Sequence, residues 1–299
     1  MKKTKEKKVI APNECSFGRW VAVLAVGLLL GLVFMIPLYF LLYGREGSFM
    51  GITYTNYFGV LGFIPPLWGL VISIRLIGKT SFKDFVLGVG GKVNPKQCLI
   101  VAGLYAGGFA IPFLMTANNV GWRGVDPIRF LFLTVFMVLV AWMQTTTEEI
   151  IFRGLIVRWV CKNKVGYTKK ALIAAVISAL LFAICHAPNP EVTSQSGFAI
   201  ILAVFAYAIP GFMLFIANLH FGNLLPGFII HLINNFMLFT VISSEVSVAT
   251  YPTLLIDKTP DNAIWSVVST LLAYLPVAIY IVIDIIRRKK SASSANKES

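Results

Sequence analysis

Three short motifs place carboxylate, imidazole and amide side chains inside long apolar segments of the 299-residue chain. A charged group at the centre of a bilayer costs about 2.5–3.5 kcal/mol on insertion scales, so such residues are candidates for chemistry. The motifs read Glu148-Glu149-Ile-Ile-Phe-Arg153, Phe182-Ala-Ile-Cys-His186 and His231-Leu-Ile-Asn234-Asn235.

The first motif contains two adjacent carboxylates with different expected partners. Glu149 and Arg153 are four residues apart, which places them on one helix face as an ion pair. Glu148 points about 100° away from Glu149, so it is the candidate general base for activating a water molecule. The alternative is purely structural: a Glu149–Arg153 brace with Glu148 extending toward the membrane surface.

The second and third motifs repeat the four-residue spacing. Phe182 and His186 share one helix face, and so do His231 and Asn235. Taken singly, the second motif is an interfacial histidine, and the third is a hydrogen-bonding contact between helices. Asn234 is expected on a different face from Asn235, and His220 is expected to be solvated in the turn between residues 218 and 223.

The depth of these residues in the membrane favours a common site. Counted from the nearest cytoplasmic boundary, Glu148 lies roughly 21 Å along its helix at about 1.5 Å per residue. His186 lies roughly 24 Å deep, His231 roughly 14 Å and Asn235 roughly 20 Å on the same basis. The motifs are therefore predicted to meet at one level.

The composition predicts an all-α polytopic membrane protein. Hydrophobic residues make up 57% of the chain and charged residues only 13%, which excludes a soluble enzyme. The net charge of +13 is explained by basic cytoplasmic loops rather than by nucleic-acid binding. A bundle of eight transmembrane helices is expected, with spans near residues 20–43, 58–77, 97–116, 128–160, 171–186, 197–218, 224–243 and 262–286.

The distribution of basic residues orients these spans. With the N-terminus inside, 22 of the 26 Lys and Arg residues fall on the cytoplasmic side. The protein is therefore predicted to lie in the cell membrane with both termini cytoplasmic. The expected organisation is a basic tail over residues 1–18, a transmembrane domain over 19–287 with its motif-bearing core at about 135–245, and a disordered cytoplasmic tail over 288–299.

In this order and in an eight-span chain, the three motifs resemble the CPBP family of CAAX-prenyl-type proteases and bacteriocin-processing enzymes. The resemblance covers roughly residues 135–245, includes the triplet Phe152-Arg153-Gly154, and implies an intramembrane endopeptidase. It implies that Glu148 and His186 activate water, and that His231 and Asn235 form an oxyanion hole. Glu149, Arg153 and Phe182 are then structural supports of the site.

Two other functions stay open at this point. A zinc-dependent protease would use Glu148, Glu149, His186 and His231 as ligands, whereas the first interpretation needs no metal or other cofactor. A non-catalytic immunity or signalling protein of the same fold would bind a partner without cutting it. The expected partners are the lipid bilayer and a membrane-embedded or lipidated protein or peptide substrate, and the sequence does not show whether that substrate is prenylated.

Overall fold

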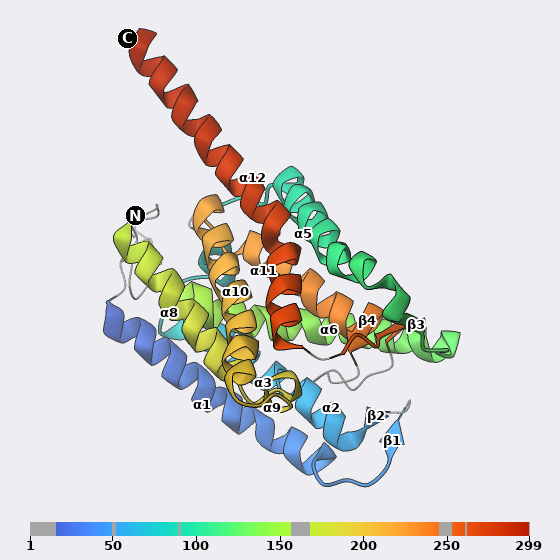
Figure 1. The fold of residues 1–299 in the computed structure, drawn as a ribbon. Helices are drawn as coiled ribbons and strands as arrows, with labels where there is room; N and C mark the ends of the chain where they lie inside the picture. Colours follow the sequence, from blue (N-terminus) through green and yellow to red (C-terminus); the bar gives the residue numbers. More distant parts are fainter. Residues whose placement is uncertain are drawn as a thin grey trace, which may run out of the picture. The chain divides into compact units, whose positions relative to one another are not determined.

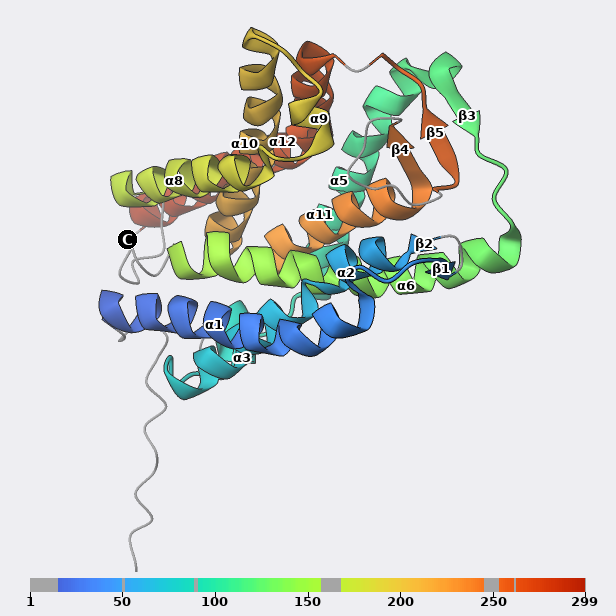
Figure 2. The same cartoon turned by 90° about the horizontal axis from the view of Figure 1, so that it is seen from below.

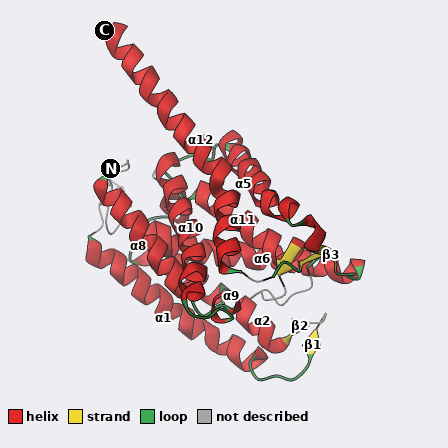
Figure 3. Ribbon diagram, in the orientation of Figure 1, coloured by secondary structure: helices red, strands yellow, loops and turns green. Residues whose placement is uncertain are grey.

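The computed structural model describes residues 16–49, 52–88, 91–156, 168–244, 253–260 and 262–298. Helices dominate the described chain, with a few short strands between them (Figure 3). Two compact units are present. The first comprises residues 1–93, 139–174 and 222–225, and the second comprises residues 94–138, 175–221 and 226–299.

Seven helices in the described residues are long and apolar enough to cross a membrane, which confirms the predicted all-α polytopic membrane fold. Their candidate spans are Phe17–Leu42, Asn56–Leu76, Pro95–Met115, Pro127–Leu155, Lys169–His186, Phe198–Phe221 and Ala263–Arg288. The segment expected as the seventh of eight spans forms a shorter apolar helix, Leu225–Val241. The count of eight therefore stays a prediction.

The first unit is built around the close packing of α1 (Phe17–Leu42) on α3 (Ile64–Leu76), which Figure 1 and Figure 2 show at the start of the chain. Gly27 and Gly31 on α1 face Gly69 on α3, and a Cβ atom at Gly69 would lie 2.0 Å from the carbonyl oxygen of Gly27. Small residues spaced by four let helix backbones approach in a membrane, where apolar lipid supplies no driving force for association.

Shorter elements complete the first unit. The hairpin of β1 (Ser48–Phe49) and β2 (Ile52–Thr53) leads into α2 (Tyr54–Leu61). Helix α4 (Phe82–Leu87) begins where the Ser81 hydroxyl accepts a hydrogen bond from the Asp84 amide at 3.0 Å, a typical N-cap. Its Phe85 is buried against Trp20, with ring centroids 5.7 Å apart.

The second unit contains α5 (Pro95–Met115), α10 (Phe198–Phe221) and α12 (Ala263–Glu298). Helix α12 packs on both of the others (Figure 1). Gly108 permits the contact with α5, because a Cβ atom there would lie 2.3 Å from the carbonyl oxygen of Ala273. The core includes Tyr105, Leu214, Ile230, Tyr274 and Val277.

A small three-stranded sheet in the second unit joins segments far apart in the sequence (Figure 2). The central strand β5 (Leu255–Asp257) pairs antiparallel with β3 (Val120–Trp122) and parallel with β4 (Ile242–Ser244). A single 3₁₀ turn, Ala117–Asn119, precedes β3, and α9 (Pro190–Thr193) precedes α10.

Helices α6 (Pro127–Glu148), α8 (Lys169–His186) and α11 (Leu225–Phe236) carry the three motifs. The first continues directly into a π-helix at Glu149–Leu155, and the third into a π-helix at Met237–Val241. A π-helix is rare and is often found at functional sites. All of the first motif after Glu148 thus lies in this unusual geometry, and the third motif is followed by it.

The described structure differs from the sequence expectation at the end of α12 and at His220. Residues 288–298, expected as a disordered tail, continue α12 as helix to Glu298, because extending an existing helix costs far less than starting one. His220 was expected to be solvated in a turn, but it lies within α10, which extends to Phe221, and it is only 8% exposed. Its Nε2 atom lies 2.9 Å from Oδ2 of Asp284, which also pairs with Arg288 at 2.7 Å.

Candidate active site

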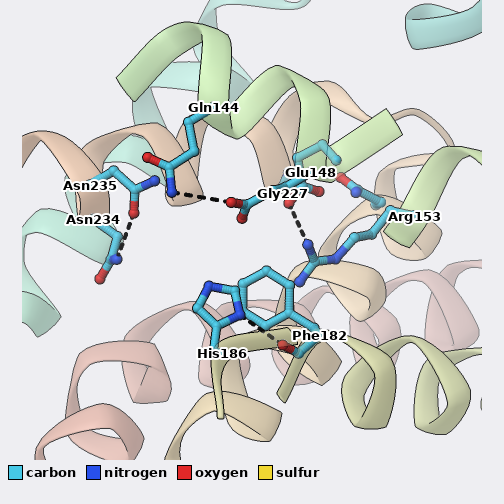
Figure 4. Close-up of polar contacts among 10 residues, drawn as sticks. Gln144, Glu148, Arg153, Phe182, His186, Gly227, Asn234 and Asn235 are labelled. Atoms are coloured by element: carbon cyan, nitrogen blue, oxygen red, sulfur yellow. Dashed lines mark hydrogen bonds and ion pairs between the residues drawn. The ribbon is translucent and has the colours of Figure 1, made fainter. Parts of the chain in front are cut away.

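The first motif lies in the first unit, at the junction of α6 and its π-helix. Glu148 is the last residue of α6 and is buried. Its Oε1 atom accepts a hydrogen bond of 3.1 Å from Nε2 of Gln144, one turn earlier (Figure 4). Between them, the hydroxyls of Thr146 and Thr147 donate to carbonyl oxygens one turn back, so they are bound within the helix.

The ion pair predicted from the spacing of Glu149 and Arg153 is present in the structure. Nη1 of Arg153 lies 2.8 Å from Oε1 of Glu149, and the two side chains are 0% and 3% exposed (Figure 4). The next residue, Gly154, allows α4 to approach, since a Cβ atom there would lie 2.6 Å from the Phe85 ring. Burial makes the pairing important, because either charge alone would be strongly destabilising.

The second motif lies in the second unit, at the end of α8. Nδ1 of His186 lies 2.7 Å from the carbonyl oxygen of Phe182 (Figure 4). Because a carbonyl oxygen can only accept, Nδ1 carries the proton in the neutral ring and Nε2 keeps a lone pair that can take a proton. Phe182 is held in turn by α10, where a Cβ atom at Gly211 would lie 3.3 Å from its Cβ.

Aromatic contacts connect this motif to its neighbours within the second unit. The His186 ring lies between Phe182, with centroids 4.2 Å apart, and Tyr207 of α10, which is stacked at 4.7 Å. Tyr207 also accepts a hydrogen bond of 3.0 Å from the Asn189 amide. Phe182 meets the His231 ring edge-on at 5.7 Å. The second and third motifs are therefore in direct contact.

The third motif lies on α11, where His231 and Asn235 are buried, 4% and 6% exposed, one turn apart. The start of this helix is clamped to α10, because the Asn218 side-chain oxygen accepts a hydrogen bond of 2.7 Å from the Gly227 amide. Gly227 must be glycine for this approach, since a Cβ atom would lie 2.5 Å from that oxygen.

Asn234, which helical periodicity places on a different face from Asn235, nevertheless contacts it. Its Nδ2 atom donates a hydrogen bond of 3.1 Å to Oδ1 of Asn235, and its own Oδ1 accepts one of 2.7 Å from the Tyr105 hydroxyl (Figure 4 shows the first). Backbone directions about 100° apart do not prevent contact between two flexible amides on neighbouring residues.

Contacts within the units thus group the predicted residues into two sets. Glu148, Glu149 and Arg153 belong to the first unit. Phe182 joins His186 to His231 in the second unit, which also contains Asn235. The meeting of Glu148 with His186, inferred from membrane depth, stays a prediction.

Three residues in these contacts were not identified from the sequence. Gln144 is four residues before Glu148, so the same-face rule could have found it. Tyr105 and Tyr207 lie well inside apolar spans, whereas membrane tyrosines are usually enriched at the interfaces. The position of a tyrosine in the interior of a span is the sequence signal that could have identified both residues.

The zinc alternative takes its ligands from both units, Glu148 and Glu149 from the first and His186 and His231 from the second. Across the described parts of the chain, no three His, Cys, Asp or Glu side chains gather as a metal site requires. Glu149, one of the four ligands of the zinc alternative, is bound to Arg153. The ion pair therefore competes with zinc for that carboxylate.

The fold and these contacts define a multi-pass α-helical membrane protein with buried ionisable motifs. Residues 129–237 match the family described as type II CAAX prenyl endopeptidase Rce1-like. This segment, a little over a third of the chain, contains all three motifs, so the resemblance predicted from them is confirmed there. The family is one of proteases and also contains non-catalytic members. No curated protein and no solved structure matches the chain significantly.

Proposed function

We propose that this protein is an intramembrane endopeptidase that hydrolyses a peptide bond of a membrane-embedded or lipidated substrate. The observation that carries the proposal is the buried contact of the second and third motifs, within a segment similar to a protease family. The three motifs supply a base, a proton carrier and two hydrogen-bond donors. These are the groups that peptide hydrolysis by water requires.

In the proposed mechanism, Glu148 takes a proton from water as the water oxygen bonds to the scissile carbonyl carbon. His186, with Nε2 able to exchange a proton, assists this activation. His231 and Asn235 donate hydrogen bonds to the negative carbonyl oxygen that forms. As the C–N bond breaks, the proton passes to the leaving nitrogen, which gives a carboxylate and an amine.

Mass spectrometry of membrane peptides tests the activity and identifies the substrate together. Cells that carry the wild type are compared with cells that carry Glu148→Ala. We expect uncut precursors to accumulate in the variant and their cleavage products to be present in the wild type. The same peptide pattern in both strains would instead favour the non-catalytic alternative.

The Asn235→Ala variant is expected to lower kcat by about 10²–10³, the usual effect of removing one oxyanion donor. KM should change little, because the bond to the carbonyl oxygen strengthens only in the transition state. Turnover is measured with a synthetic copy of the accumulated precursor in proteoliposomes. A change in KM alone would return Asn235 to a structural role between helices.

Activity is expected to survive exhaustive chelation, and purified protein should hold no stoichiometric zinc. The reason is that Glu149 is paired with Arg153, which removes one oxygen ligand from the zinc alternative. Elemental analysis and turnover before and after chelation make the measurement. Loss of turnover that added zinc restores would favour the metalloprotease.

Both termini are proposed to be cytoplasmic, with residues 44–57 and 245–261 on the opposite side. Single-cysteine variants in a cysteine-free background test this with a membrane-impermeant thiol reagent. Ser48→Cys on exposed β1 and Ser247→Cys, outside the described residues, should react in intact cells. Ser291→Cys on the exposed end of α12 should react only after permeabilisation. Protection of the first two sites would contradict the orientation.

A further inference from the structure

Three side chains of the second unit form a hydrogen-bonded chain that ends at the proposed oxyanion donor. The Tyr105 hydroxyl donates to Oδ1 of Asn234 at 2.7 Å, and Nδ2 of Asn234 donates to Oδ1 of Asn235 at 3.1 Å. Tyr105 belongs to α5, and the two asparagines belong to α11. These hydrogen bonds therefore connect two helices through Tyr105 and Asn234, which are 129 residues apart in sequence.

The far end of this chain is held firmly. Tyr105 is 1% exposed, and its ring packs against Tyr274 at 5.0 Å and Phe109 at 6.2 Å. The approach of α5 to α12 at Gly108 leaves no room for the backbone to shift inward. A fixed hydroxyl thus sets the position of the Asn234 amide.

The amide of Asn235 has two ends of nearly the same shape and opposite polarity. Rotation by half a turn exchanges its NH₂ donor with its carbonyl acceptor. Only the NH₂ end can stabilise a negative oxygen, whereas the carbonyl end would repel it. A donor helps a reaction most when its direction is fixed before the charge develops.

We propose that Tyr105 and Asn234 are positioning residues that fix the Asn235 amide with its NH₂ group toward the reacting carbonyl. This rests on the proposed function, in which Asn235 is an oxyanion donor. Because Oδ1 of Asn235 accepts the hydrogen bond from Asn234, its Nδ2 lies on the opposite side of the amide carbon. Tyr105 thus fixes the orientation of the Asn234 amide, and Asn234 in turn fixes the orientation of the Asn235 amide.

The first test measures turnover of the precursor probe in a double-mutant cycle. Asn234→Ala is expected to lower kcat about tenfold and Tyr105→Phe about threefold, the range for loss of one neutral hydrogen bond, with KM unchanged. In the Asn235→Ala background neither substitution should reduce kcat further, because the group they orient is absent. Asn234→Asp, which can accept from Tyr105 but cannot donate when ionised, should lose at least as much as Asn234→Ala.

A matched control separates positioning from general damage. Thr240 is also buried in the second unit, but its hydroxyl donates to the carbonyl oxygen of Phe236 within its own helix segment. Thr240→Val should leave kcat and KM unchanged. Thermal unfolding of all variants excludes misfolded protein, and a cycle between Tyr105→Phe and Asn234→Ala should show coupling in stability.

The outcomes distinguish the positioning role of Tyr105 and Asn234, here called the relay, from the proposed proteolytic function on which it rests. Equal losses in the wild-type and Asn235→Ala backgrounds, or changes confined to KM, would overturn the relay alone. The absence of stability coupling between Tyr105 and Asn234 would overturn it as well. Full activity of Asn235→Ala would overturn the oxyanion role of Asn235 together with the relay, and a wild type that cuts no precursor would overturn the proposed function.

Discussion

Glu148→Gln is expected to lower turnover by roughly 10²–10⁴ while the protein stays folded, since a general base contributes an effect of that size. Glutamine has the shape of glutamate and its side-chain oxygen can still accept the hydrogen bond from Gln144. It cannot take a proton from water. Turnover of the precursor probe and thermal unfolding of the purified variant provide the two measurements.

The adjacent carboxylate offers a control with the same chemical change. Glu149→Gln makes the same carboxylate-to-amide change at the neighbouring position, and it keeps the side-chain shape equally well. If both variants lose activity to the same extent and both lose stability, Glu148 has no distinct chemical role. Full activity of Glu148→Gln would exclude it as the base.

Glu149→Gln is expected to destabilise the protein by about 3–5 kcal/mol, the usual cost of removing one partner of a buried ion pair. A guanidinium stays protonated in proteins, so Arg153, which is 0% exposed, would keep a buried charge after losing its carboxylate partner at 2.8 Å. The measurement is the free energy of unfolding in detergent or bicelles, with turnover followed on the remaining folded fraction.

Replacing both partners provides the complementary variant. Glu149→Leu combined with Arg153→Met removes both charges and keeps a similar volume, and such exchanges are often neutral or stabilising. The double variant should therefore regain most of the stability lost by Glu149→Gln. A Glu149→Gln variant as stable as the wild type would show that the pair contributes little.

Local features of the candidate site were predictable because they depend on spacing along one helix. Glu149 and Arg153 are four residues apart, and a helical turn brings them together whatever surrounds them. The same rule places His231 and Asn235 on one face of α11. The membrane fold class followed from composition, because only helices or closed barrels satisfy the backbone in lipid.

Contacts between helices were not predictable in this way. Tyr105 reaches Asn234, His220 pairs with Asp284, and Tyr207 stacks on His186, all across different helices. The spacing along α11 predicted the face of Asn234, but it did not predict the partner of that side chain on α5. Sequence spacing fixes directions around one helix axis and contains no information about which other helix lies there.

The sequence by itself determined the class of protein, the long apolar helices and the pairing of residues one turn apart. Only the tertiary structure decided which helix faces meet, and the membrane explains why. Leu32, Phe40 and Leu131 are more than 60% exposed, whereas Leu70, Leu214 and Ile230 are fully buried, although all six are large apolar residues. Residues that face lipid and residues that face the protein core are both apolar, so hydropathy cannot distinguish them. Small residues such as Gly69 and polar partners such as Tyr105 then select the packing, through close approach and directed hydrogen bonds.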